Sequence, residues 1–166
     1  MREVGANLNH VSHDHFLYRT PLMLACYLGK FHLASALLLA GLVNGGRIVD
    51  PNAVRQACGP REPGGAARQP IAGLTALIDA VREGYIAIAA LLLAHGSDIN
   101  QADAANRTPL WHAQYMATKH QHKGMVEYLV QKGASLIPSG RSVLTVPPTF
   151  DGDMNNMEYL EVLQAL

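Results

Sequence analysis

Arg107-Thr108-Pro109-Leu110 is the third copy of a phrase that decides the fold of this chain. The earlier copies are Arg19-Thr20-Pro21-Leu22 and Leu74-Thr75-Ala76-Leu77, and the second and third copies start 33 residues apart. Each copy is followed by two short apolar helical patterns. A period of this size indicates stacked repeats, in which each unit covers the apolar face of its neighbour and none is stable alone.

Glycines recur in register with these threonines. In the first two copies, one glycine follows the threonine by nine residues and another by twenty-one. The last copy keeps only the second glycine, which a four-residue insertion within 115–122 delays. Four residues are about one helical turn, so the insertion lengthens a helix without rotating its apolar face. The recurring glycines are Gly29, Gly41, Gly84, Gly96 and Gly133. Each is expected to adopt a positive φ angle where one helix ends and the chain reverses.

Together these residues resemble the ankyrin repeat, whose consensus runs roughly G-x-T-P-L-H-x-A-A-x-x-G-H-x-E-V-V-x-L-L-L-x-x-G-A-D-V-N. The middle copy matches best, with Gly73-Leu74-Thr75-Ala76-Leu77, Leu91-Leu92-Leu93 and Gly96-Ser97-Asp98-Ile99-Asn100. The resemblance implies an all-α solenoid of stacked antiparallel helix pairs joined by β-turn-like fingers.

One departure from the consensus concerns the histidine three residues after the threonine. Met23, Ile78 and Trp111 replace it, so the hydrogen bond that the family draws between histidine and threonine is lost. The threonine hydroxyl still suits a helix N-cap, and proline suits the first helical turn. We expect the three larger side chains to pack into the stack, and the helix starts to be less tightly specified.

The chain is expected to form one ankyrin-repeat domain over residues 1–166. Its predicted parts are the end of a preceding partial repeat (1–17), a first repeat (18–44), a Gly/Pro-rich finger insertion (45–72), a second repeat (73–105), a third repeat (106–139) and a degenerate C-terminal repeat (140–166). Gly5-Ala6-Asn7-Leu8-Asn9 looks like the end of a repeat whose helices are missing. A domain from a longer repeat protein is favoured over a complete small protein with worn end units.

The insertion makes the junction from Gly41 to Thr75 22 residues longer than the one from Gly96 to Thr108. Asp50-Pro51 predicts a short helix through Ala57. Two interpretations stay open: a surface loop, which is tolerated because closure entropy grows slowly with length, or a basic arm that grips an acidic patch on a partner. The arginines of that arm are Arg47, Arg55, Arg61 and Arg68.

Composition limits the function classes. Thirteen basic and thirteen acidic residues give formal neutrality, so no long-range field favours nucleic acid or an acidic membrane. The longest apolar stretches, near 33–43 and 85–94, are too short to span a bilayer, and no apolar targeting run opens the chain. We expect a cytoplasmic protein that binds neither nucleic acid nor membrane. A secreted effector without a signal peptide remains an alternative.

No residue pattern predicts catalysis, a cofactor or a metal. Cys26 is expected to be buried and not to pair with Cys58, and neither cysteine has a local base to activate it. Zinc needs three or four converging ligands, and cysteine partners for a structural site are absent. Solvent exposure is expected for the histidines that lie outside the core positions: His10, His13, His15, His112, His120 and His122.

The family resemblance implies partner binding on a concave groove, lined by the finger tips and the outer face of each first helix. Carried over position by position, the candidates are Leu24, Tyr27, Leu28, Asp79, Arg82, Glu83, Asn106, His112, Tyr115 and Met116. Asp79 and Glu83 are four residues apart and are expected to share a solvent-facing surface. Tyr27, Arg82 and Tyr115 are the hypothesised binding anchors, because such side chains are enriched at interfaces. Alternatively, the two tyrosines merely cover neighbouring units.

The sequence therefore predicts a non-catalytic module that binds another protein or a peptide. Two alternatives stay open: an adaptor part of a larger enzyme or secreted effector, and a small inhibitor or immunity protein that blocks an enzyme. Weak self-association through the exposed ends of the stack is also expected.

Overall fold

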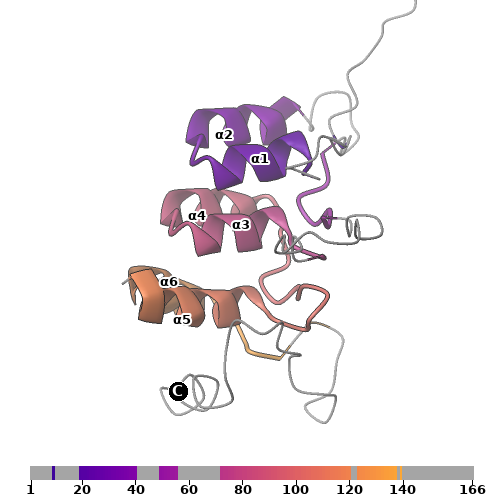
Figure 1. Cartoon of the computed structure of the whole chain (residues 1–166). Coiled ribbons are helices and arrows are strands. Elements are labelled where there is room, and N and C mark those ends of the chain that lie inside the picture. The colour runs from indigo at the N-terminus through magenta and orange to yellow at the C-terminus, as the bar shows by residue number, and fades with distance from the viewer. Residues whose placement is uncertain are drawn as a thin grey trace, which may run out of the picture.

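A computed structural model of the protein describes residues 9, 19–40, 49–55, 72–120, 123–137 and 139, except for the side chains of 119 and 120. These residues contain six α-helices and no β-strand. The helices are α1 (Pro21–Tyr27), α2 (Phe31–Ala40), α3 (Ala76–Arg82), α4 (Ile86–Ala94), α5 (Pro109–His120) and α6 (Lys123–Gln131). They form three pairs stacked one on another (Figure 1). The predicted all-α solenoid is confirmed.

A threonine caps the first helix of every pair. Its Oγ1 accepts a hydrogen bond from the N–H three residues later, which satisfies a backbone donor that the helix leaves unpaired. The pairs are Thr20 with Met23 (3.3 Å), Thr75 with Ile78 (3.2 Å) and Thr108 with Trp111 (3.3 Å). These three donor residues replace the family's histidine, and their side chains are at most 4% exposed. They pack into the stack, as expected.

Glycines in the left-handed region allow the first two helix pairs to turn. Gly29 (φ 68°) follows α1 and Gly84 (φ 78°) follows α3. A Cβ at Gly29 would lie 2.6 Å from the Cζ of Tyr85, so the tyrosine of the second unit lies directly against the turn of the first. Gly96 and Gly133 also have positive φ angles, as predicted. Gly41 lies outside the described residues.

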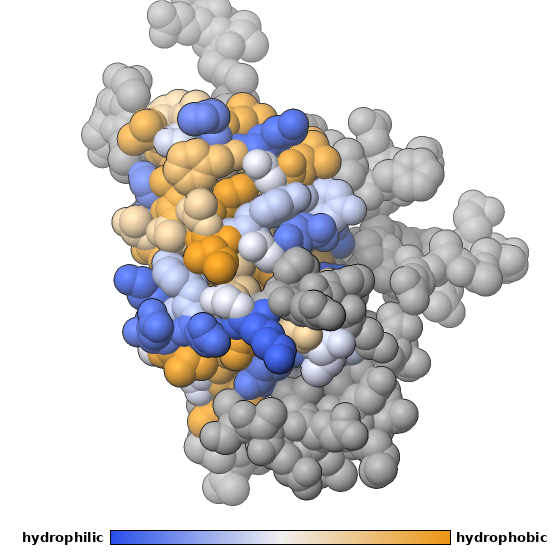
Figure 2. All heavy atoms as spheres, turned by 90° about the vertical axis from the view of Figure 1, so that its left-hand side faces the viewer, coloured by the Kyte–Doolittle hydropathy of each residue, from blue (hydrophilic) through white to orange (hydrophobic). Residues whose placement is uncertain are grey.

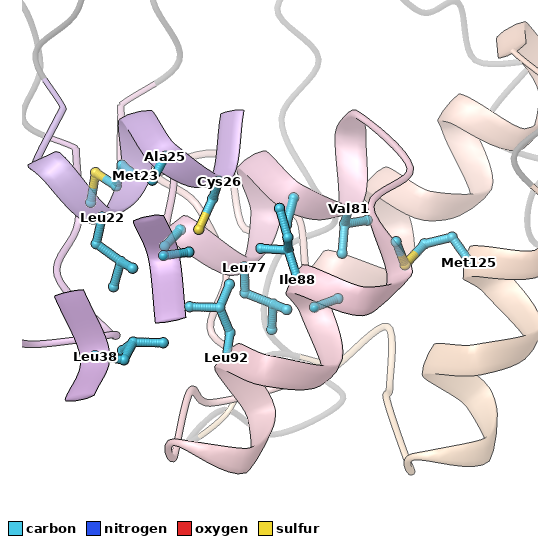
Figure 3. Close-up of a cluster of buried hydrophobic side chains, with 14 of the residues drawn as sticks. Leu22, Met23, Ala25, Cys26, Leu38, Leu77, Val81, Ile88, Leu92 and Met125 are labelled. Carbon is cyan, nitrogen blue, oxygen red and sulfur yellow. The ribbon is translucent and has the colours of Figure 1, made fainter. Parts of the chain in front are cut away.

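The core is continuous from one pair to the next. Leu22 and Cys26 on α1 lie against the second pair, whose Leu77 and Ile88 are at most 2% exposed, and Met125 on α6 continues the cluster (Figure 3). Each fully buried aliphatic side chain of this kind contributes roughly 1.5–3 kcal/mol. The first helices α1, α3 and α5 pack against one another more extensively than α2, α4 and α6 do. The stack is therefore tighter on the side of the first helices.

The predicted helix beginning at Asp50 is wrong within the described part of that stretch, 50–55. The Asp50 carbonyl accepts the N–H of Ala53 (3.3 Å), and its Oδ1 accepts the N–H of Asn52 (2.9 Å). Asp-Pro can begin either a helix or a turn, and here the aspartate side chain bonds its own backbone two residues on, which favours the turn. Residues 56 and 57 lie outside the described residues.

Hydrogen bonds locate the insertion within the finger. Asp50 occupies the position that Asp98 has in the next finger, with the same bond from side chain to N–H two residues on. Arg55 then exchanges two backbone hydrogen bonds with 73–74, from its N–H to Leu74 O and from Gly73 N–H to its own carbonyl (both 2.8 Å). The extra 22 residues therefore divide: seven precede the Asp50 turn and fifteen lie between Asp50 and Thr75.

Candidate functional site

The candidate strip on α1, α3 and α5 consists of three columns, at the fourth, seventh and eighth residues after each capping threonine. The fourth-residue column is Leu24, Asp79 and His112; the seventh is Tyr27, Arg82 and Tyr115; the eighth is Leu28, Glu83 and Met116. Tyr27 is 38% exposed and Leu28 50% exposed, and the other four side chains of the outer two columns are partly exposed. The fourth-residue column is different, because Asp79 and His112 are only 2% exposed.

Asp79 therefore does not share a solvent-facing surface with Glu83, and that expectation is wrong. Arg19 grips its carboxylate with two contacts, from Nε to Oδ2 (3.1 Å) and from Nη2 to Oδ1 (3.4 Å). A carboxylate is rarely buried unless it is paired, and the fork of arginine matches both oxygens. The partners are 60 residues apart, so helical periodicity alone could not reveal the pair.

Arg19 also fixes the first tyrosine of the strip. Its guanidinium carbon lies 4.2 Å from the centroid of the Tyr27 ring, within the range of a cation–π interaction. One arginine thus connects the end of α1 to the buried Asp79 on α3. The position of Tyr27 depends on a contact between two units of the stack.

His112 is also buried, which corrects the expectation that it is exposed. Its Nε2 lies 3.0 Å from Asp103 Oδ2, and the same oxygen accepts a hydrogen bond from Arg107 Nε (2.8 Å). Asp103 Oδ1 accepts the backbone N–H groups of Ala105 (2.9 Å) and Arg107 (3.0 Å). Asp103 therefore ties the third finger to α5.

Burial sets the protonation states in this cluster. It lowers the pKa of His112 to about 4, with the charges of Arg82 and Arg107 acting in the same direction against the opposing effect of Asp103. His112 is therefore neutral at pH 7, and its Nε2–H donates to Asp103. Burial alone would raise the pKa of Asp103, but the hydrogen bond from His112 and the charge of Arg107 outweigh it and leave that pKa below its ordinary value.

The second tyrosine of the strip stacks on a buried tryptophan. Trp111 and Tyr115 have ring centroids 5.6 Å apart and an interplanar angle of 13°. The Arg107 guanidinium carbon lies 5.2 Å from the Trp111 centroid. Trp111 is 4% exposed, which confirms that it packs inward. In both outer units, the arginine before the capping threonine thus supports the tyrosine of the seventh-residue column.

An asparagine ladder, which was not among the features predicted from the sequence, joins the fingers. The Oδ1 atoms of Asn9, Asn52 and Asn100 accept the backbone N–H groups of the next finger, at Asp50 (3.0 Å), Asp98 (2.7 Å) and Ser135 (2.7 Å) respectively. The signal was present, because Asp50-x-Asn52 has the spacing of Asp98-x-Asn100. It was hidden by the assignment of 45–72 to a single insertion.

A polar groove lies between these fingers, with a volume of about 400 Å³. Its lining residues, which define the finger groove, are Asn52, Asp98, Gln101, Ala102, Asp103, Asn106 and Ser139. Asn106 is the only candidate site residue among them. It has a φ angle of 62°, in the left-handed region that asparagine tolerates better than most residues.

A separate apolar surface lies where the helix pairs turn. Leu28 (50% exposed), Phe31 (39%), Tyr85 (38%) and Ile86 (38%) contribute to it. Figure 2 shows this face: hydrophobic side chains gather over the first two pairs, and hydrophilic ones over the third. Leu28 thus belongs both to the candidate strip and to this surface.

Among the described residues, Cys26 is not an activated nucleophile and no group of side chains is placed to hold a metal ion. Cys26 is free and buried, and burial, followed by the charge of Asp79, raises the pKa of its thiol to about 12. A thiol that stays protonated is a poor nucleophile. Within the described ranges, no three His, Cys, Asp or Glu side chains are placed to hold a metal ion, and no helix is both long and apolar enough to cross a membrane.

Several predictions fall outside this part of the chain. Cys58 is one, together with the histidine side chains at His10, His13, His15, His120 and His122. The degenerate repeat at 140–166 is another.

Stacked helix pairs, capping threonines and bonded fingers define a helical repeat protein, in which each described helix pair packs on the next. The model of the family "Ankyrin repeats (3 copies)" matches residues 3–103 and 50–139, and the chain belongs to the ankyrin repeat family. Members of this family are generally protein-interaction modules and are typically non-catalytic. Comparison with the curated proteins finds no match.

Proposed function

We propose that this chain is a non-catalytic module that binds another protein or a peptide along its first helices and fingers. The observation that carries the proposal is the pair of tyrosines in the seventh-residue column. Tyr27 is 38% exposed yet lies against Arg19, and Tyr115 is partly exposed yet stacks on Trp111. Both are partly accessible, and both are held in one orientation.

Such an arrangement favours binding for an energetic reason. Ordering a flexible side chain at an interface costs roughly 0.5–1.5 kcal/mol, and an aromatic ring that is already fixed avoids much of this. Aromatic residues and arginine also dominate binding hot spots. Arg82 lies between the two tyrosines along the stack, on α3. A partner with an apolar contact at each end and an acidic group in the middle fits this column.

The other candidates divide into two groups. Leu24, Leu28, Glu83, Asn106 and Met116 retain exposed surface and are proposed to contact the partner. Asp79 and His112 are buried, so we propose that they act indirectly, by holding α3 and α5 in place. A cytoplasmic location is proposed as well, which suits a chain whose buried Cys26 is free.

The test starts with a partner identified by crosslinking and mass spectrometry in the native host. Its affinity is then measured by titration calorimetry against a triple variant, Tyr27→Ala, Arg82→Ala and Tyr115→Ala. The matched control carries Leu33→Ala, Leu39→Ala and Val130→Ala, which change side chains 51–55% exposed on second helices. We expect the triple variant to bind on the order of 100-fold more weakly, since each hot spot contributes more than about 1 kcal/mol. Equal affinity of both variants would contradict the proposal.

A further inference from the structure

The finger groove carries a charge that the rest of the described structure leaves unopposed. Among the described residues that line it, two are carboxylates and none is a lysine or an arginine. Asp103 is already paired with Arg107 at 2.8 Å. Asp98 Oδ1 accepts only neutral donors, the N–H of Asn100 (2.9 Å) and the hydroxyl of Ser139 (2.9 Å). A carboxylate in a concave wall that has no ion-pair partner among the described residues favours a positive group.

The groove also contains an acceptor that lacks a donor. Gln101 Nε2 donates to the carbonyl of Asn52 (3.2 Å), which fixes the orientation of its amide. The other amide atom, Oε1, is buried and has no hydrogen-bond partner among the described residues. Buried acceptors are normally satisfied, so this exception needs an explanation, and a donor from a ligand supplies one if the Gln101 side chain moves enough to expose Oε1.

Hydrogen bonds connect the fingers that form the walls of the groove. Asn52 accepts the N–H of Asp98 (2.7 Å) on one side, and Ser139 donates its N–H to the carbonyl of Asn100 (3.1 Å) on the other. At the rim, Asn106 has a left-handed backbone (φ 62°), which asparagine adopts more readily than most residues other than glycine.

We infer that the finger groove binds an arginine side chain presented by the partner, with the guanidinium directed at the Asp98 carboxylate and the Gln101 Oε1. This inference rests on the proposed function, because it specifies the chemistry of one contact with that partner. A guanidinium carries five donors in a planar fork, which suits a carboxylate beside an amide oxygen. Lysine supplies the same charge without the fork and is expected to bind more weakly.

The experiment uses the full chain labelled with ¹⁵N and follows backbone amide shifts by NMR. The probes are N-acetyl-arginine methylamide and the matching citrulline compound, which has nearly the same shape but no charge. We expect saturable shifts at Asp98, Gln101 and Asn106 with the arginine probe, and binding at least tenfold weaker with citrulline. The lysine compound is expected to bind more weakly than the arginine compound. The glutamate compound is expected not to bind.

Two variants provide the matched control. Asp98→Asn keeps the Oδ1 acceptor and removes the charge, so it should lower arginine affinity at least fivefold. Asp50→Asn makes the same change at the equivalent position of the preceding finger. Asp50 itself does not line the groove, so this variant should leave the affinity unchanged. A thermal unfolding measurement on each variant checks that it folds. Equal binding of arginine and citrulline, equal effects of the two variants, or shifts centred on Glu83 or Glu127 would overturn the inference.

The two proposals fail separately. If the partner still requires Tyr27 and Tyr115 while the arginine probe ignores the groove, only this inference is wrong. If the probe binds as expected while the triple variant keeps its partner affinity, the proposed binding strip is wrong instead.

Discussion

The first and third units place an arginine directly before the capping threonine, yet they use it differently. Arg19 reaches forward to Asp79 in the second unit, whereas Arg107 turns back to Asp103 in its own finger. Both guanidinium groups also support an aromatic ring of their own unit. The same sequence position therefore joins two units at one end of the stack and stiffens a single unit at the other.

The largest expected effect comes from removing the centre of the third-unit cluster. Asp103→Ala removes the acceptor of four donors. Two are the backbone N–H groups of Ala105 and Arg107, and two are the side-chain atoms Arg107 Nε and His112 Nε2. Leaving a buried charge without its partner costs about 3–5 kcal/mol. We expect a loss of about 4 kcal/mol in the free energy of unfolding, measured by urea denaturation at pH 7.

Asp50→Ala is the control for that change, because Asp50 is exposed and caps only its own turn. It should lower stability by no more than about 1 kcal/mol, the usual worth of a single hydrogen bond. Similar losses in the two variants would mean that the buried cluster does not tie the finger to α5.

Removing Arg19, which joins the first unit to the second, is expected to lower the free energy of unfolding somewhat less. Arg19→Met leaves the Asp79 carboxylate buried without a cation, but the Arg19 side chain retains 9% exposure, so water can partly replace it. We expect a loss of about 3 kcal/mol in the same urea experiment.

A second substitution shows whether that loss comes from the stranded charge. Adding Asp79→Leu to Arg19→Met removes the unpaired carboxylate and should recover most of the stability, since apolar replacements of buried ion pairs are often neutral. A double variant as unstable as Arg19→Met alone would indicate that lost packing around Arg19 is the cause.

Acid should affect the first and third units differently, because only the third has a buried titratable base in the fourth-residue column. The pKa of His112 is about 4 in the folded protein and about 6.5 when unfolded, so the unfolded chain takes up the proton first as the pH falls. The contribution of neutral His112 to the free energy of unfolding is therefore complete above pH 6.5. It is lost progressively as the pH falls toward 4, by about 3 kcal/mol in all. The lowered pKa of Asp103 acts in the same direction, but only below its ordinary value of 3.8.

The measurement is urea denaturation at pH 7.0, 5.5 and 4.5 for the natural chain and for His112→Gln. The variant cannot titrate at this position and should lose much less stability between pH 7.0 and 4.5. The equivalent residue of the first unit is Leu24, which has no charge to change. Parallel pH profiles for the two proteins would show that His112 does not gain its proton on unfolding.

The difference between the end units also shows which features could be predicted from the sequence and which could not. The threonine caps, the glycine turns and the inward Trp111 follow from local chemistry and helical periodicity, and all were predicted. The burial of Asp79 depends on Arg19, 60 residues earlier, and a single sequence does not show which distant residue supplies a counter-charge. His112 depends on Asp103, nine residues earlier in the finger, across a turn that the helical pattern does not describe.

The finger ladder gives the smallest effect and extends the comparison to the enlarged finger. Asn52 accepts the Asp98 N–H (2.7 Å) and donates to Gly96 O (3.1 Å), so Asn52→Ala removes two contacts between adjacent fingers. At about 1 kcal/mol for each net hydrogen bond, we expect a loss of about 1–2 kcal/mol in urea. Asn100→Ala removes the equivalent acceptor one finger later, where Ser139 supplies further bonds. Its loss should be smaller, and hydrogen exchange should confine the two effects to the Asp98 and Ser135 amides respectively. Identical exchange at both amides in both variants would show that the fingers open together, and that the insertion after Arg55 does not divide the stack into separately stable units.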